Sequence, residues 1–291
     1  MNAVDFAVPP GACDCHVHVF PDRARFPFVE KRVYTPPPAP VADLDAYLVP
    51  LGLERVVVIQ PSIYGTDNSA LLYTLDALDG RARGVAVIDA EISDAALDEM
   101  NRRGVRGVRV NLEMDGEHDP GRSARRLKEV AGRIARLGWH IQVYCLADMI
   151  GRLEDVLADL RVPIVLDHLG GITAAKGPVQ LGFGAVLGLL EAGNTYVKAS
   201  GAYLCSQRAP EFPDVIPIAQ TLIAANPDRI IWGSNWPHPD GARVPGRDPY
   251  TVLPFLPHGH AETLNLLGKW AKDAETRRRI LVDNPARLYG F

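Results

Sequence analysis

The stretch Asp14-Cys15-His16-Val17-His18-Val19 alternates polar and apolar side chains, which is the period-two pattern of a β-strand. It is the first of eight short β-branched runs, and stretches with helical periodicity lie between them. Successive strand ends lie about 32 residues apart, the size of one βαβ unit. The predicted strands are 14–19, 55–60, 84–88, 107–111, 140–145, 163–168, 195–200 and 229–233, and the predicted helices are 43–50, 69–78, 93–103, 123–136, 148–159, 181–191 and 214–225.

This repeat predicts a single α/β domain over residues 1–291, a (β/α)8 barrel of the TIM type with some distortion. Residues 1–11 would form a short N-terminal extension. The segment 240–257, rich in Pro and Gly, would form a lid at the active-site end of the barrel. An open doubly wound sheet is less well supported, because no glycine-rich nucleotide-binding turn follows any predicted strand.

The composition of the 291 residues is that of a soluble globular protein, with 47% hydrophobic and 23% charged residues. A formal net charge of −4 gives no overall basic field for binding nucleic acid or a membrane surface. The four cysteines, without a recognisable secretory signal, indicate reduced thiols and a cytoplasmic location. The longest apolar runs are much shorter than the roughly 20 residues of a membrane helix.

Strand alternation predicts which side chains enter the barrel. In the first strand, Asp14, His16 and His18 would share the inward face, while Cys13 and Cys15 would pack outward as small apolar groups. His168 would end the sixth strand in phase with Ile164 and Leu166. The inward polar set on the other strands would comprise Arg109, Asn111, Gln142, Tyr144, Lys198 and Ser200, and Asn235 follows the last strand.

These polar side chains predict a cationic, hydrogen-bonding pocket at the mouth of the barrel. Burying imidazoles, a guanidinium and an ammonium together without an anionic partner would be very costly, so an anionic ligand is the expected occupant. Any one of these residues could instead be an ordinary structural side chain. Lys198 in particular could direct its ammonium at a carboxylate in the loops.

Five motifs carry a resemblance to a known family. They are Asp14-Cys15-His16-Val17-His18-Val19-Phe20, Gln60-Pro61-Ser62-Ile63-Tyr64-Gly65-Thr66-Asp67-Asn68, Gly107-Val108-Arg109-Val110-Asn111, Leu166-Asp167-His168-Leu169-Gly170 and Trp232-Gly233-Ser234-Asn235-Trp236-Pro237-His238-Pro239. In this order they resemble the amidohydrolase superfamily, from about Gly11 to Tyr289. Within it they look most like the 2-pyrone-4,6-dicarboxylate lactonase branch, which also contains sugar-lactone hydrolases and galactarolactone isomerase.

The resemblance implies a lactone hydrolase or isomerase that attacks the ring carbonyl of a small carboxylated lactone, such as a pyrone dicarboxylate, a muconolactone or a sugar-acid lactone. His16, His18, His168 and Asn235 would be the catalytic residues, with the three imidazoles around the carbonyl. The residues that would bind the substrate are Ser62, Tyr64, Thr66, Arg109, Asn111, Tyr144, Lys198, Ser200 and His238. Arginine suits a carboxylate because its planar fork donates two parallel hydrogen bonds.

The same resemblance implies that no cofactor is needed. A binuclear site in this superfamily uses a bridging Lys or Glu on strand four, a His on strand five and an Asp after strand eight. This chain has Arg109 and Asn111, Tyr144, and Asn235 at those places. The alternative is one zinc ion held by His16, His18 and His168, since three imidazoles can form a catalytic zinc site.

Asn235 leaves the reaction type open. In lactonases of this branch the matching residue is an aspartate that activates water, whereas galactarolactone isomerase has asparagine there. An amide cannot accept a proton, so a histidine with a reference pKa of about 6.5 would serve as the base. Two rivals stand beside this prediction: a zinc-dependent hydrolase or decarboxylase on the same barrel, and a catalytically silent barrel that binds an organic acid. The sequence determines neither the lactone nor the oligomeric state.

Overall fold

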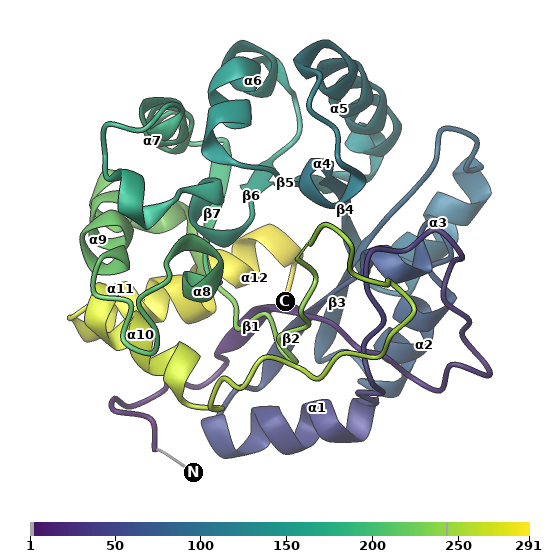
Figure 1. Cartoon of the computed structure of the whole chain (residues 1–291), viewed down its shortest axis with the longest axis horizontal. Helices are drawn as coiled ribbons and strands as arrows, with labels where there is room; N and C mark the ends of the chain where they lie inside the picture. Colours follow the sequence, from purple (N-terminus) through teal and green to yellow (C-terminus); the bar gives the residue numbers. More distant parts are fainter. Residues whose placement is uncertain (1–2, 243) are drawn as a thin grey trace.

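The computed structural model describes residues 3–242 and 244–291 and shows a ring of eight parallel strands surrounded by helices (Figure 1). Each strand pairs with the next along the chain. The strands are β1 (Cys13–Val17), β2 (Arg55–Ile59), β3 (Ala82–Ala86), β4 (Val105–Asn111), β5 (His140–Tyr144), β6 (Ile164–Leu166), β7 (Thr195–Ala199) and β8 (Ile230–Trp232). The predicted (β/α)8 fold is confirmed.

The main helices lie outside the strands, in the positions that the sequence periodicity predicts (Figure 1). They are α1 (Val41–Leu48), α2 (Ser69–Ala77), α3 (Asp94–Arg102), α5 (Pro120–Ile134), α6 (Ala147–Asp159), α7 (Phe183–Glu191) and α9 (Val215–Ala225), with α10 (Glu262–Trp270), α11 (Ala274–Arg278) and α12 (Asn284–Tyr289) near the C-terminus. Two short helices, α4 (Leu112–Asp115) and α8 (Ala202–Cys205), follow β4 and β7. Within residues 3–242 and 244–291, no helix has the length and apolarity to cross a membrane.

The barrel closes between β8 and β1 through the segment after β8. The backbone N–H of Asn235 donates to the carbonyl of His16, and the N–H of His18 donates to the carbonyl of Trp236, both at 2.8 Å. Val17 and Trp236 form an isolated parallel bridge at the same place. Asn235 is thereby fixed beside the histidines of β1.

The predicted directions of the first side chains of β1 are wrong. Cys13 and Cys15 belong to the interior cluster with Val57, Ile59 and Val85, and both are fully buried free thiols. The reason is a bulge, because the register against β2 shifts between Asp14 and Val17. A bulge inserts one extra residue and reverses the alternation beyond it.

The bulge therefore places Asp14 on the helix-facing side of β1. There its carboxylate accepts hydrogen bonds from the backbone N–H groups of His16 and Ser234, each at 3.0 Å, and lies close to Tyr47 of α1. His16 and His18 face the barrel interior as predicted, His16 lying beside Lys198 of β7. The cysteines still pack as small apolar groups, but on the opposite side of the strand.

The predicted phase of β6 is also wrong. Ile164 and Leu166 pack in the outer core with the helices, whereas Val165 belongs to the interior cluster. The strand ends at Leu166, and Asp167 continues the inward phase. His168 nevertheless reaches the interior, because its backbone turns to a φ of 47° in the 3-10 turn His168–Gly171. Two successive residues can then face the same site.

The predicted lid segment 240–257 lies beside residues 32–40 over one side of the barrel mouth (Figure 1). Thr35 forms a parallel bridge with Val252. The hydroxyl of Thr35 donates to the carbonyl of Pro249 at 2.6 Å, and the N–H of Leu253 donates to the carbonyl of Thr35 at 3.0 Å. Arg243 falls in this segment and lies outside the described residues. The position suits a cover for the site, and movement of the segment stays a prediction.

Candidate active site

A cavity of about 620 Å³ opens at the carboxyl ends of the strands. Seven residues predicted for the site line it: His18, Ser62, Arg109, Asn111, Tyr144, His168 and Asn235. Tyr34 and Tyr203, which the sequence pattern did not indicate, also border it, together with the lid residues Asp240, Gly241 and Ala242. A barrel of this kind places its active site at this end, since the strand-to-helix loops supply the reactive side chains.

Six predicted site residues do not line the cavity. His16, Lys198 and Ser200 lie beneath it and contact lining residues, as described below. His238 is buried behind Tyr203. Tyr64 packs edge-on against Phe28 in the outer core, and Thr66 is exposed and accepts a hydrogen bond from Asn68 through its carbonyl. In the Ser62–Tyr64 loop only Ser62 borders the cavity, because the 3-10 turn directs the next two side chains into the core.

Asp167 is the central charge of the site. Its carboxylate lies 3.0 Å from Arg109 Nε and 3.3 Å from Lys198 Nζ, and it accepts a hydrogen bond from Gln142 Nε2 at 2.9 Å. Burial by itself would raise the pKa of Asp167, but Lys198, Arg109 and His16 hold that pKa well below its usual range. Asp167 is therefore ionised.

This carboxylate corrects the prediction of a purely cationic pocket. The sequence motif contained Asp167, yet only the β6 geometry shows that it reaches the buried cations. Lys198 is fully buried, donates to Gln142 Oε1 at 2.7 Å, and does not extend to the substrate cavity. Pairing of Lys198 with a carboxylate was the predicted alternative, and the partner is Asp167, which directly follows β6 and faces the barrel interior.

His16 of β1 and His18, which directly follows β1, form a hydrogen-bonded chain with Lys198. Lys198 Nζ lies 3.3 Å from His16 Nδ1, His16 Nε2 lies 3.3 Å from His18 Nε2, and His18 Nδ1 lies 2.9 Å from the carbonyl of Ile59. Burial and the charge of Lys198 lower the pKa of His16, while burial and Arg109 lower that of His18 to about 3. Both imidazoles are thus neutral. The chain is satisfied when each group donates to the next, from Lys198 to the carbonyl of Ile59.

His168 lies beside His16 and borders the cavity. Its ring is 4.8 Å from that of His16 and meets Tyr144 edge-on at 5.0 Å. Ser200 Oγ lies 3.0 Å from Nδ1, which leaves the other ring nitrogen for a ligand. Burial lowers the pKa of His168 to about 3, against an opposing effect of Asp167, so this imidazole is also neutral.

Asn235 adopts a left-handed backbone with a φ of 64° and donates from Nδ2 to the hydroxyl of Tyr203 at 2.6 Å. That hydroxyl lies 3.5 Å from His238 Nδ1. Tyr203 comes three residues after Ser200, in the loop at the carboxyl end of β7. Its place after a strand end was the available sequence signal, but nothing in the sequence pairs it with Asn235.

A metal ion would find one group of donors among the described residues. Ligand atoms of His16, Asp167 and His168 lie within 4.8 Å of one another, so the group differs from the predicted three histidines by containing Asp167. The donor chemistry fits poorly, because both carboxylate oxygens already face cations. Arg109 Nε lies at one oxygen, and Lys198 Nζ lies 3.3 Å from the other. A divalent ion would have to share this single negative charge with both.

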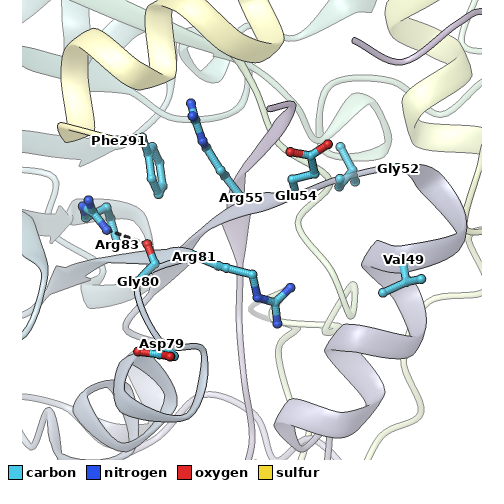
Figure 2. Close-up of a pocket in the computed structure, with 10 residues that line it drawn as sticks. Val49, Gly52, Glu54, Arg55, Asp79, Gly80, Arg81, Arg83 and Phe291 are labelled. Atoms are coloured by element: carbon cyan, nitrogen blue, oxygen red, sulfur yellow. Dashed lines mark hydrogen bonds between the residues drawn. The ribbon is translucent and has the colours of Figure 1, made fainter. Parts of the chain in front are cut away.

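A second concavity of about 630 Å³ lies at the opposite end of the barrel, at the amino ends of β2 and β3. Figure 2 shows Phe291 between Arg55 and Arg83, whose guanidinium carbons lie 5.5 and 4.7 Å from the ring centre. Arg83 donates to the carbonyls of Gly80 and Gly290 at 3.0 and 2.7 Å. These contacts fasten the C-terminal end of the described chain to the barrel, and none of the described residues that border this hollow carries an imidazole, thiol or hydroxyl.

A closed (β/α)8 ring with two histidines at the end of its first strand and a third after its sixth defines a barrel of the amidohydrolase class. The chain belongs to the amidohydrolase family, and the match extends over residues 13–291.

Three curated relatives match nearly the whole chain. A 4-sulfomuconolactone hydrolase of Hydrogenophaga intermedia is 35% identical, over 100% of this chain and 92% of its own length. A 2-pyrone-4,6-dicarboxylate hydrolase of Comamonas testosteroni is 37% identical, over 98% of this chain and 92% of its own length. A D-galactarolactone isomerase of Agrobacterium fabrum is 28% identical, over 97% of this chain and 92% of its own length. The branch inferred from the sequence motifs is confirmed.

A solved structure from Pseudomonas putida, provisionally named a 2-pyrone-4,6-dicarboxylic acid hydrolase, has the same fold. It is 30% identical and superposes with a TM-score of 0.80, covering 97% of this chain and 98% of its own.

Proposed function

We propose that this protein is an enzyme that hydrolyses or isomerises a small anionic lactone by attack at the ring carbonyl. The observation that carries the proposal is the joint position of neutral imidazoles and a guanidinium on one cavity: His18 and His168 border it together with Arg109. The named relatives, two lactone hydrolases and a lactone isomerase, support the same chemistry.

Arg109 binds the carboxylate of the substrate in this proposal. Its Nε is engaged by Asp167, while its two terminal nitrogens have no hydrogen-bond partner among the described residues. Those nitrogens can form the bidentate pair that guanidinium groups make with carboxylates. Ser62 and Asn111 lie on the same wall of the cavity and supply further hydrogen bonds. Tyr144 holds the guanidinium from its ring face, 5.5 Å away.

His18 and His168 surround the ring carbonyl. A hydroxyl oxygen attacks the carbonyl carbon, the new C–O bond forms, and negative charge develops on the carbonyl oxygen. Collapse of this intermediate breaks the ring C–O bond. The proton of the attacking hydroxyl passes to the free nitrogen of His168 and then to the departing ring oxygen, so the step needs no external acid.

The substrate itself prepares His168 for this proton transfer. In the empty site the pKa of His168 is about 3, which is low for a base. A carboxylate bound to Arg109 adds negative charge beside the imidazole and offsets the charge of the guanidinium. Both effects raise the pKa of His168 towards the working range of a general base.

The identity of the attacking hydroxyl decides the product. Water gives the open-chain acid, whereas a hydroxyl of the substrate gives a new lactone. Asn235 cannot take the proton from either, because an amide does not act as a base near neutral pH. It can orient the attacking oxygen, which is compatible with both outcomes.

We further propose that the reaction needs no metal. The support is electrostatic, since Lys198 and Arg109 already neutralise Asp167 and would repel a divalent ion. A zinc-dependent hydrolase is the second candidate, and the group of His16, Asp167 and His168 favours it. In that case zinc would polarise the carbonyl or lower the pKa of a water molecule.

A lactone panel followed by NMR tests the proposed function. Purified enzyme is mixed with pyrone, muconolactone-type and sugar-acid lactones in water enriched in the heavy oxygen isotope. We expect turnover of at least one anionic lactone, and mass spectrometry of the product then separates hydrolysis from isomerisation. If lactones bind and none of them is turned over, the result would favour a silent organic-acid-binding barrel and would contradict the proposal.

A further inference from the structure

We propose that Tyr203 is a positioning residue, which fixes the amide of Asn235 so that its oxygen, and not its nitrogen, faces the attacking hydroxyl. The inference rests on the lactone chemistry proposed above, and it assigns the residue that prepares the position of the nucleophile.

The geometry begins with the surroundings of Tyr203. It lies on α8, borders the cavity, and stacks on His258 with ring centres 4.3 Å apart. Its hydroxyl accepts the hydrogen bond of Asn235 Nδ2 at 2.6 Å. The hydroxyl hydrogen must then point elsewhere. Among the described residues the remaining partner is His238 Nδ1, at 3.5 Å.

The bond from Asn235 Nδ2 gives this chain one direction, and the protonation states are compatible with it. Burial raises the pKa of Tyr203, so the phenol keeps its proton. Burial also lowers the pKa of His238 to about 3, so the imidazole is neutral and has one nitrogen lone pair. Because Asn235 Nδ2 donates to Tyr203, the phenol proton is left to donate to His238 Nδ1, which accepts it when the imidazole carries its own proton on Nε2.

The consequence lies at the other end of the amide. The backbone of Asn235 is held by the bond from its N–H to the carbonyl of His16, so rotation of the amide is the main freedom left. With Nδ2 bound to Tyr203, Oδ1 is available to accept a hydrogen bond from the attacking O–H. A reversed amide would present N–H groups, which would bind the oxygen lone pair needed for the attack.

The experiment uses the symmetry of a carboxylate. Tyr203→Phe removes the hydroxyl, and we expect kcat to fall about 10- to 100-fold while KM changes less than about 3-fold, because a misplaced nucleophile slows the chemical step more than binding. In the Asn235→Asp background the same change should lower kcat less than about 3-fold, because a carboxylate has two equivalent oxygens and needs no choice between them. Tyr73→Phe, a change at an exposed tyrosine of α2, is the matched control.

Two outcomes would overturn the positioning role. One is a Tyr203→Phe enzyme with wild-type kcat. The other is an equal loss in both backgrounds, which would show that Tyr203 acts through packing alone. If Tyr203→Phe does not fold, His238→Phe removes the acceptor of the phenol proton instead and should give the same background-dependent loss.

An NMR measurement separates this inference from the proposed function. In ¹⁵N-labelled protein, the side-chain amide protons of Asn235 should be slowed in exchange with water by the bond to Tyr203 and should exchange faster in Tyr203→Phe. Unchanged exchange would overturn the inference even if lactones are turned over. Slowed exchange that depends on Tyr203, in a protein that turns over no lactone, would support the geometry and refute the function.

Discussion

Two fully buried aspartates on opposite faces of the barrel wall have opposite properties. Asp14 faces the helices, and burial raises its pKa to about 6, because it forms no ion pair among the described residues and the hydrogen bonds from Ser234 and His16 oppose only part of the effect of burial. Asp167 faces the interior, where Lys198 and Arg109 lower its pKa despite equal burial. The difference shows that charged partners, and not depth, decide in which direction the pKa of a buried carboxyl group shifts.

The largest expected loss of stability and activity follows from a change to Asp167, on the interior face of the barrel wall. Asp167→Asn would leave Lys198 and Arg109 buried without a negative partner, so we expect a loss of about 3–5 kcal/mol of stability and no measurable turnover. Urea denaturation and steady-state kinetics measure the two effects. Asp14→Asn is the matched control, and it should cost less because an amide oxygen can still accept the two backbone hydrogen bonds. A larger loss for Asp14→Asn than for Asp167→Asn would reverse the comparison.

A smaller loss of activity is expected when the imidazole of His168, the neighbour of Asp167 in the chain, is removed. His168→Ala should lower kcat about 10²–10⁴-fold, the usual contribution of a general acid–base group, while the fold persists. Steady-state kinetics and circular dichroism measure this, with the exposed His118→Ala as a control. Retained activity in His168→Ala would remove this residue from the proposed mechanism.

The pH dependence of stability sharpens the comparison further. The pKa of Asp14 is about 6 in the folded chain against an ordinary value of 3.8, so the folded state binds the extra proton. The free energy of unfolding should therefore fall by roughly 2–3 kcal/mol as the pH rises from about 4 through 6. Asp167 has the opposite sign, and its contribution is lost only as the pH falls below the usual carboxylate range.

Denaturation at a series of pH values measures both contributions. Asp14→Asn should remove the fall in stability between about pH 4 and pH 6, while leaving the loss at lower pH in place. An unchanged pH profile in Asp14→Asn would show that this carboxyl does not titrate with a raised pKa.

The smallest expected effect is that of a chelator. If Lys198 and Arg109 keep Asp167 fully paired, dialysis against EDTA should change kcat less than about 2-fold, as followed by lactone turnover and elemental analysis. Stoichiometric zinc that restores lost activity would instead assign Asp167, His16 and His168 to a metal site.

Regular strands were predictable in detail, and irregular ones were not. In β4, β5 and β7, alternation correctly placed Arg109, Gln142 and Lys198 inside the barrel. The bulge of β1 and the positive φ of His168 break that alternation. Neither is visible in residue types, because valine and histidine at these places are equally compatible with a straight strand.

The site shows the same division. The histidines and Arg109 were identifiable because polar residues at strand ends converge in a barrel. Tyr203 was not, since its role depends on a contact with Asn235 across 32 positions of the chain. Asp167 stood inside a quoted motif, but its partners come from β4, β5 and β7.

The sequence by itself determined the barrel, the family and the mouth of the barrel as the place of the chemistry, because periodicity and motif order are properties of neighbouring residues. Tertiary structure decided the charge state of each buried group and the direction of the Asn235 amide. Both depend on which atoms lie within hydrogen-bonding distance of one another, and these contacts join residues that are far apart along the chain.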